Sequence, residues 1–158
     1  MKKEVILKGK GFILRPYKKS DGEFVVKILN NEKVSSGISA KKPYLYSIEN
    51  FNKFWGKIKN VNKLTYFAIE IKEKFVGSIS LDLNEKGLAT LGYWLDEEYW
   101  GKGIITEAIS LIIEYGMKNF SIEKIVAEVH DNNPASKKVL INNGFINNNG
   151  GVFIKMLK

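Results

Sequence analysis

The segment 88–108 (LATLGYWLDEEYWGKGIITEA) constrains the fold more than any other part of the chain. An apolar strand pattern over 88–95 leads to Gly101, Lys102 and Gly103, and a helical pattern begins directly behind the second glycine. The first N–H groups of a helix have no partner within the helix, and the helix dipole is positive at this end. The glycines leave the backbone accessible, and the lysine adds a positive charge. This strand–turn–helix unit therefore predicts a site for an anion such as phosphate or pyrophosphate.

Two common phosphate-binding motifs do not fit this turn. A dinucleotide fingerprint, G-x-G-x-x-G, would need a third glycine where the chain has Thr106, and a Walker A loop, G-x-x-x-x-G-K-[ST], is absent. A bare G-x-G is also compatible with an ordinary tight turn between a strand and a helix. The turn alone indicates a geometry for binding anions and does not name the ligand.

The same residues resemble the acyl-coenzyme A signature of the GNAT acetyltransferases, written [QR]-x-x-G-x-[GA]. The signature runs here from Trp100 to Ile105. Tryptophan in the first position, LGYWL upstream and TEA downstream are similar to the RimJ/RimL-like branch, which acetylates ribosomal-protein N-termini. Ile105 departs from the pattern, because the family usually has alanine or glycine there. A branched side chain is tolerable at this position if it points into the core and harmful if it faces the pyrophosphate.

This resemblance implies a mixed α+β (α/β) GNAT fold, with residues 1–158 as a single domain. The implied fold is a mostly antiparallel, twisted sheet of about seven strands flanked by about four helices, with strands 88–95 and 124–130 splayed apart. Acetyl-CoA is the implied cosubstrate, and no metal is expected. The residues that the resemblance places around coenzyme A are Trp94, Leu95, Trp100, Gly101, Lys102, Gly103, Ile104, Ile105, Thr106, Asn133 and Ser136.

Hydropathy patterns along the chain predict the element order β-αα-βββ-α-β-α-ββ, which is that of the GNAT fold. Strands are expected over 11–16, 65–71, 75–83, 88–95 and 124–130, a hairpin over 145–157, and helices over 20–31, 47–58 and 103–118 and from 134. Ser20 and Glu23 have the spacing of a capping box that opens the first helix. Phe75, Ile79 and Leu81 are expected on one face of their strand.

A second set of residues lies in the segment 131–145, DNNPASKKVLINNGF. Asn133 before Pro134 is typical of a helix N-cap and first turn, and Gly144 is typical of the residue after a helix. These capping roles explain the residues without any further function. By the resemblance, Asn133 also binds the pantetheine arm, and Ser136 lies close to the thioester sulfur.

The chemistry that the resemblance implies needs a neutral amine, a stabilised oxyanion and a proton for the leaving thiolate. Many GNATs place a proton-donating tyrosine at the position of Leu140, which cannot serve, so Ser136 becomes the candidate acid. The alternative is that Ser136 only helps to cap its helix. A backbone N–H near Leu95, unpaired where the strands splay, can bind the thioester oxygen. Glu128, acting through water, is the candidate base. Other polar residues nearby are interpreted as surface or structural groups: Glu70, Asp82, Tyr93 and His130.

Composition excludes several classes of site. The chain has no cysteine and one histidine, so it cannot form disulfides, a thiolate nucleophile or a metal site rich in Cys or His. Its net charge of +8 should speed the capture of the polyanionic coenzyme A and assist approach to a ribosome. Basic runs interleaved with aromatic residues are absent, which argues against direct nucleic-acid binding. Without a membrane-spanning run or a signal-peptide core, a cytoplasmic location is expected.

The leading hypothesis is an acetyl-CoA-dependent N-acetyltransferase that acts on the N-terminal α-amine of a protein or peptide, as a monomer or homodimer and without a membrane partner. An α-amine has a reference pKa of roughly 7.7 to 8.0 against roughly 10.4 for lysine, so it needs less help from a base. Three alternatives stay open. They are acetylation of a small amine such as a polyamine or an aminoglycoside, binding of acyl-CoA without turnover, and a basic RNA-binding domain.

Overall fold

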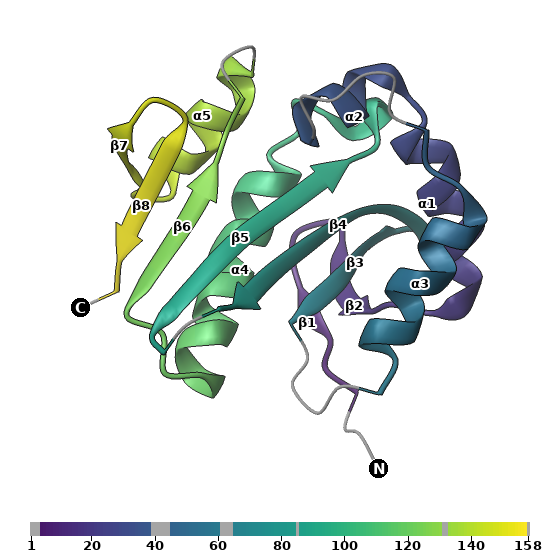
Figure 1. Cartoon of the computed structure of the whole chain (residues 1–158), viewed down its shortest axis with the longest axis horizontal. Helices are drawn as coiled ribbons and strands as arrows, with labels where there is room; N and C mark the ends of the chain where they lie inside the picture. The colour runs from purple at the N-terminus through teal and green to yellow at the C-terminus, as the bar shows by residue number, and fades with distance from the viewer. Residues whose placement is uncertain (1–3, 39–44, 61–64, 85, 131–132, 158) are drawn as a thin grey trace.

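An eight-stranded sheet forms the centre of the molecule (Figure 1). The computed structural model describes residues 4–38, 45–60, 65–84, 86–130 and 133–157. Neighbouring strands follow the order β1-β2-β3-β4-β5-β6-β8-β7, and among these described strands only β5 and β6 pair in parallel. The strand bounds are β1 (Leu7–Lys8), β2 (Ile13–Pro16), β3 (Tyr66–Ile71), β4 (Lys74–Leu83), β5 (Leu88–Leu95), β6 (Lys124–Glu128), β7 (Ile146–Asn149) and β8 (Val152–Met156).

Within the described ranges, five α-helices cover the two faces of the sheet. They are α1 (Gly22–Leu29), α2 (Glu32–Ile38), α3 (Ile48–Ile58), α4 (Ile104–Asn119) and α5 (Pro134–Asn142). The first three pack on one face, and α4 and α5 pack on the other. None of the described helices combines the length and the apolarity that crossing a bilayer requires. The predicted mixed, mostly antiparallel architecture is confirmed, with β1 and α2 as additional elements.

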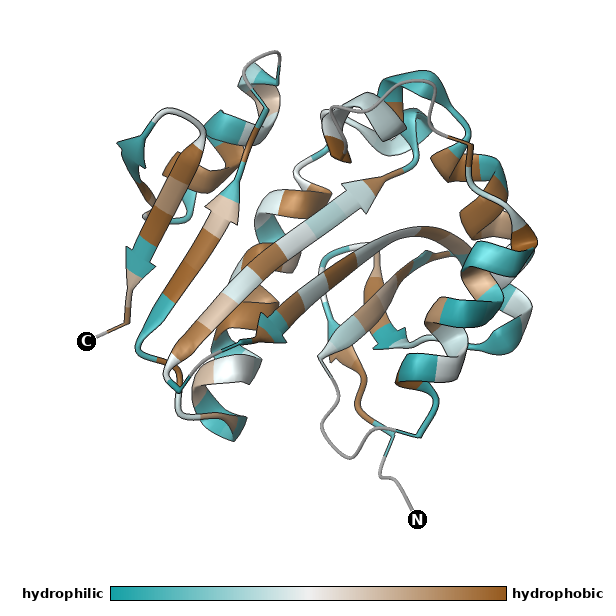
Figure 2. Cartoon of the chain, viewed as in Figure 1, coloured by the Kyte–Doolittle hydropathy of each residue, from teal (hydrophilic) through white to brown (hydrophobic). Residues whose placement is uncertain are grey.

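Each face of the sheet has its own hydrophobic core. The main core lies between the sheet and α4 and is mostly aliphatic, with Ile79, Ile109 and Ile112 fully buried. The second core lies under α1 and α3 and is rich in aromatic residues; the rings of Tyr17 and Phe54, for example, meet edge to face at 5.2 Å. Figure 2 shows the hydrophobic residues recurring along the central strands that separate these cores. Both faces of the central strands are buried, so the sheet separates two packed layers.

The start of α1 differs from the prediction. Helix α1 begins at Gly22, behind a single 3₁₀ turn over Lys19–Asp21, and the capping box predicted for Ser20 and Glu23 is not present. The reach-back bond comes instead from Asp21, whose carboxylate accepts a hydrogen bond from the Lys18 backbone N–H at 2.8 Å. A Cβ at Gly22 would lie 2.7 Å from the ring of Phe51, so glycine permits the close contact of α1 with α3.

Arg15 explains why Asp21 is buried. The Arg15 guanidinium binds both carboxylate oxygens of Asp21, at 2.9 and 2.8 Å, and also the carboxylate of Glu70 at 2.5 Å. The two carboxylates raise the pKa of Arg15 against the lowering effect of its burial. This buried ion triad joins β2, β3 and the first turn, and it gives Glu70 a structural role, as predicted.

Ser47 caps the start of α3, as expected for a serine that directly precedes a helix. The Ser47 hydroxyl accepts a hydrogen bond from the Asn50 backbone N–H at 3.2 Å, and the Asn50 side chain reaches back to the Ser47 N–H at 2.9 Å. These reciprocal bonds form a capping box.

A β-bulge corrects the predicted face of Phe75. Residue Ile69 pairs with Gly77 but Glu70 pairs with Phe75, so Val76 is an extra residue in β4. Because side chains alternate along a strand, one inserted residue moves Phe75 to the opposite face from Ile79. Phe75 accordingly packs in the aromatic core, where its ring lies 5.8 Å from that of Trp94.

Candidate active site

The parallel strands β5 and β6 separate after a short paired stretch. Residues 88–90 pair with 124–126, and the pairing stops there. Strand β5 continues against β4 as far as Leu95, while β6 stays paired with β8 as far as Glu128. The predicted splay is confirmed, and it leaves an opening in the sheet beside residues 91–95.

The register of β4 and β5 directs the backbone of Leu95 into this opening. Opposed residues in an antiparallel pair alternate between hydrogen-bonded and non-hydrogen-bonded positions. Asp96 donates its N–H to the Val76 carbonyl at 2.8 Å, one step beyond the pair of Leu95 and Gly77, which is therefore a non-hydrogen-bonded pair. The N–H and C=O of Leu95 consequently face away from β4. Its carbonyl accepts a hydrogen bond from the Trp100 indole at 2.8 Å.

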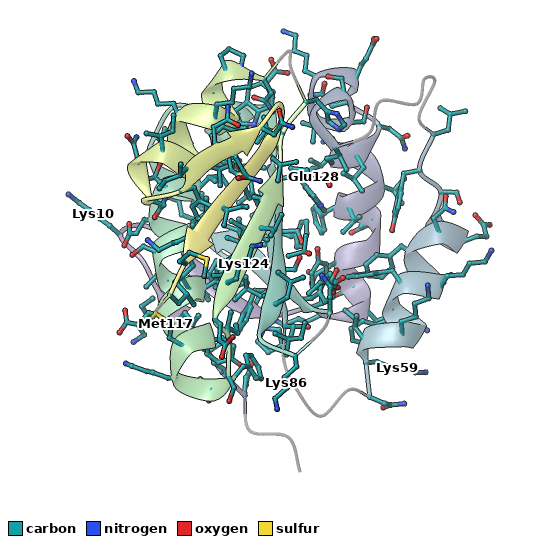
Figure 3. The ribbon with its side chains drawn as sticks, turned by 60° about the vertical axis from the view of Figure 1, so that its left-hand side comes forward. Lys10, Lys59, Lys86, Met117, Lys124 and Glu128 are labelled. Atoms are coloured by element: carbon teal, nitrogen blue, oxygen red, sulfur yellow. The ribbon has the colours of Figure 1, made fainter. Side chains whose placement is uncertain are left out.

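A cavity of about 1020 Å³ occupies the opening and extends over the α1–α3 face of the sheet. Except for Lys102, every residue that the family resemblance places around coenzyme A lines this cavity: Trp94, Leu95, Trp100, Gly101, Gly103, Ile104, Ile105, Thr106, Asn133 and Ser136. Glu128, the candidate base, lines it as well, near the end of β6 (Figure 3). The structure thus brings both predicted groups of residues to one cavity.

The turn before α4 has the form predicted for an anion site. Gly101 and Gly103 both have positive φ angles, 76° and 79°, a conformation that side-chain-bearing residues rarely adopt. A Cβ at either glycine would have no heavy atom within 4 Å, so the backbone here faces open space. Gly103 is the N-cap of α4, which places the first N–H groups of that helix at the cavity wall.

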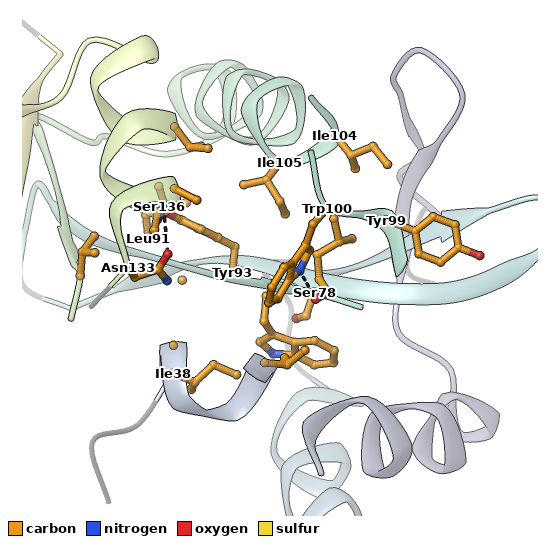
Figure 4. Close-up of a pocket in the computed structure, with 18 of the residues that line it drawn as sticks. Ile38, Ser78, Leu91, Tyr93, Tyr99, Trp100, Ile104, Ile105, Asn133 and Ser136 are labelled. Atoms are coloured by element: carbon orange, nitrogen blue, oxygen red, sulfur yellow. Dashed lines mark hydrogen bonds between the residues drawn. The ribbon is translucent and has the colours of Figure 1, made fainter. Parts of the chain in front are cut away.

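Two side chains near the turn, those of Lys102 and Ile105, do not simply face the anion site or the core. Lys102 is exposed, and its Nζ lies 5.5 Å from the centre of the Tyr99 ring, beside a smaller hollow that Lys10, Lys72 and Lys74 also line. Ile105 is half-buried; it packs against the main core and also forms part of the cavity wall (Figure 4). The isoleucine therefore combines the two orientations that the sequence left open.

Helix α5 begins and ends with the predicted caps. The Asn133 side chain accepts a hydrogen bond from the Ser136 backbone N–H at 3.1 Å, and Pro134 occupies the first turn. At the other end, Gly144 has a φ of 83°, and Phe145 donates its N–H to the Leu140 carbonyl at 3.0 Å. The caps fix Asn133 and Ser136 at the cavity.

Tyr93 makes a contact that the sequence does not predict. Its hydroxyl forms a short hydrogen bond with the Ser136 hydroxyl, which links β5 to the first turn of α5 (Figure 4). Burial raises the pKa of Tyr93, and the bond to Ser136 lowers it by a smaller amount. Leu140 is fully buried in the main core and is not among the residues that line the cavity. A phenol therefore reaches the cavity from the strand rather than from position 140.

Asp82 has a structural partner, as predicted. Its carboxylate oxygens both accept the Tyr66 hydroxyl at 2.8 Å. Burial, followed by the bond to Asp82, raises the pKa of Tyr66. His130 lines the cavity just beyond the end of β6. Among the described residues that line the cavity, Glu128 is the only carboxylate.

A match to a known family covers the strands and helices that build this cavity. The family described as acetyltransferase (GNAT) domain matches residues 12–146. The chain belongs to the GNAT acetyltransferase family. This match confirms the resemblance read from the glycine turn, and it identifies the domain as one of a family of acyltransferases.

Relatives of this GNAT domain include ribosomal-protein acetyltransferases. The chain is 34% identical to the ribosomal-protein-serine acetyltransferase of Escherichia coli (strain K12) over 82 residues, which are 51% of this chain and 46% of the relative. The match thus spans about half the length of that curated relative.

Solved structures share the fold over nearly the whole chain. The ribosomal-protein-S5-alanine acetyltransferase from Vibrio fischeri superposes with a TM-score of 0.76 at 24% identity, covering 96% of each chain. The spermidine N-acetyltransferase from Vibrio cholerae, in complex with CoA and spermine, superposes with a TM-score of 0.80 at 20% identity, covering 94% of this chain and 96% of that one. At these identities the likeness establishes the fold.

On the α1–α3 face, the cavity of this GNAT domain has an aromatic wall and a floor of small residues. Ser78 and Ser80 are buried in β4, opposite Trp94 and Gly92 of β5. Tyr17, Phe54 and Tyr66 close the wall. Burial raises the pKa of Tyr17, and its hydrogen bond to Ser78 lowers it by less. This half of the cavity can hold a small polar group against apolar rings.

Proposed function

We propose that this GNAT domain transfers the acetyl group of acetyl-CoA to the N-terminal α-amine of a peptide or protein, with a role in the cytoplasm where ribosomal proteins are made. The opening between β5 and β6 is the observation that carries the proposal. It joins the glycine turn on one side of the sheet to the aromatic half of the cavity on the other. A cofactor and an acceptor can therefore approach one reacting atom from opposite faces.

The cofactor fits the residues on the α4 and α5 side. The first N–H groups of α4 and the two positive-φ glycines would bind the pyrophosphate. Asn133 would bind the pantetheine arm, which brings the thioester into the opening. The Leu95 N–H would then donate to the thioester oxygen as negative charge develops there.

The charge of the cavity favours an acceptor with one amine over a polyamine. Lys33 and Lys138 line the cavity, while Glu128 is its only carboxylate among the described residues. A polyamine would bring several positive charges to a site with little negative charge to balance them. An α-amine with a pKa of about 7.8 is about 14% neutral at pH 7, against about 0.04% for a lysine side chain. An α-amine therefore depends less on a catalytic base. We propose that Glu128 is this base and accepts the amine proton through water.

Two measurements test this function. Calorimetry should show micromolar, one-to-one binding of acetyl-CoA and none of adenosine. Gly103→Arg should abolish the binding at a cost of about 1 to 2 kcal/mol of stability, because this position has a left-handed φ. Release of CoA should then be followed with a thiol reagent, which meets no protein thiol because the chain has no cysteine. Peptides with free N-termini should react fastest, and Glu128→Gln should lower their kcat/KM about tenfold. Faster turnover of spermidine than of every peptide would refute the acceptor class, and binding without turnover of any amine would refute the reaction.

A further inference from the structure

The hydrogen bond between Tyr93 and Ser136 spans the opening of the sheet. Tyr93 lies on β5 and Ser136 in the first turn of α5, and both residues line the cavity (Figure 4). The register explains the direction of Tyr93: it stands opposite Ile79, a residue of the main core, so its ring points to the side of the sheet that carries α4 and α5. The contact therefore lies on the side of the opening where the thioester would enter.

The acidity of the two hydroxyls favours Tyr93 as the donor in this bond. A phenol is the more acidic group and the better donor, while an alkyl hydroxyl accepts readily through its lone pairs. With Tyr93 donating, the hydrogen of the Ser136 hydroxyl is available to point into the cavity. The Asn133 cap binds the backbone of Ser136, not its side chain, and so holds this turn in place without using the hydroxyl.

We propose that Tyr93 is a positioning residue for Ser136, and that the two hydroxyls act as one relay that protonates the thiolate leaving the acetyl group. This inference rests on the proposed function. The amine nitrogen bonds the carbonyl carbon, the C–S bond breaks, and its electron pair goes to sulfur. Sulfur takes the Ser136 hydroxyl proton, Ser136 takes the phenolic proton of Tyr93, and water returns a proton to Tyr93. The proton that the amine loses passes through water to Glu128 and from there to solvent, so the exchange balances.

Leu140 cannot supply a phenolic proton, and the bonded pair of Tyr93 and Ser136 offers another source of one. Position 140 faces the main core, with none of its surface exposed. Tyr93 brings a hydroxyl to the same cavity from the strand, and this hydroxyl is bonded to that of Ser136. Loss of the Tyr93 hydroxyl should therefore slow the chemical step and leave the binding of acetyl-CoA unchanged.

A double-mutant cycle tests the relay, with saturating peptide and acetyl-CoA. Ser136→Ala should lower kcat about 100-fold and Tyr93→Phe about tenfold, with the Kd for acetyl-CoA within about twofold of wild type. The double variant should be no slower than Ser136→Ala, because Tyr93 acts through the serine. As a control, Tyr115→Phe should keep wild-type kcat, since that ring packs against Phe67 and Phe120 and does not line the cavity.

A fluorinated tyrosine at position 93 provides a readout that a purely structural role would not move. If Tyr93 supplies the proton, kcat should fall at high pH as the phenol ionises. Fluorine lowers the pKa of the phenol, so this fall should occur at lower pH in the fluorinated protein. Three results would each overturn the relay. The losses in kcat could multiply in the double variant, Tyr93→Phe could weaken acetyl-CoA binding and leave kcat unchanged, or the pH profile of kcat could stay unshifted. A wild-type protein that binds acetyl-CoA but acetylates no amine would overturn both the proposed function and the relay. A wild type that acetylates peptides, with variants that behave otherwise than expected, would overturn the relay alone.

Discussion

Gly92 offers a way to close the proposed acceptor half of the cavity without changing the proposed cofactor half. It lies exposed on the floor, opposite Ser80, and a Cβ built there would have the Ser80 hydroxyl as its nearest neighbour at 3.4 Å. Its φ is not in the left-handed region, so side chains are permitted. Glycine inside a strand costs about 0.5 to 1 kcal/mol relative to alanine, and β-branched residues favour strands. Gly92→Ala and Gly92→Val should therefore fold at least as stably as wild type.

The acetylation of peptides should fall in the Gly92→Val variant, although its stability does not. The valine side chain fills space that the acceptor backbone would occupy, and the misfit should cost about 1 to 3 kcal/mol, as overpacking does in protein cores. At about 1.4 kcal/mol per factor of ten, kcat/KM for a peptide should fall about 5-fold to 150-fold. Steady-state kinetics at saturating acetyl-CoA measures this loss, calorimetry should show an unchanged Kd for acetyl-CoA, and urea denaturation gives the stability.

Gly77, a second glycine of the sheet, provides the control for the stability prediction, because a side chain there has no room. A Cβ at Gly77, on the neighbouring strand, would lie 2.5 Å from the Trp94 carbonyl oxygen, so Gly77→Ala should lose about 3 kcal/mol of stability. If Gly92→Val kept wild-type kcat/KM for peptides, or weakened acetyl-CoA binding, the assignment of the acceptor to this face would be wrong.

Three further predictions concern the turn and the ion triad. Ile105→Ala should tighten acetyl-CoA binding about threefold or more by calorimetry, because it removes a branched group from the cavity wall; weaker binding would mean that the isoleucine contacts the cofactor favourably. Lys102→Ala should change the same Kd less than about twofold, since its Nζ lies over Tyr99; a tenfold loss would place that charge on the cofactor. Asp21→Ala should destabilise the protein by about 3 to 5 kcal/mol in urea, because it leaves the buried Arg15 with one partner fewer; a loss below 1 kcal/mol would show that water replaces the carboxylate.

Features set by neighbouring residues could be predicted from the sequence. The glycine turn, the Ser47 cap and the caps of α5 each depend on a few consecutive residues whose side chains bond the nearby backbone. The splay could be expected only through the family resemblance, because it depends on how two distant strands pair. Gly101, Gly103 and Asn133, which local signals of this kind singled out, also line the cavity.

Features set by distant contacts could not be predicted in the same way. Asp21 displaced the predicted capping box because Arg15, six residues earlier, binds its carboxylate, and the distant Glu70 of β3 binds the same guanidinium. Phe75 changed faces because one extra residue in β4 shifts the alternation. Tyr93 looked like a structural residue because its partner Ser136 is 43 positions away, and alternation along β5 gives only the face, not the neighbour.

The two departures from the family pattern have different consequences because they lie in different places. Leu140 is part of the main core, so its lack of a hydroxyl changes nothing at the cavity, and the Tyr93–Ser136 pair can supply the proton from another direction. Ile105 lies at the cavity wall, where its bulk would act on the proposed cofactor. The first departure should therefore affect the route of a proton and the second the strength of binding. Measuring kcat and Kd separately distinguishes these effects, because a residue that acts only on the departing thiolate has no influence before the C–S bond begins to break.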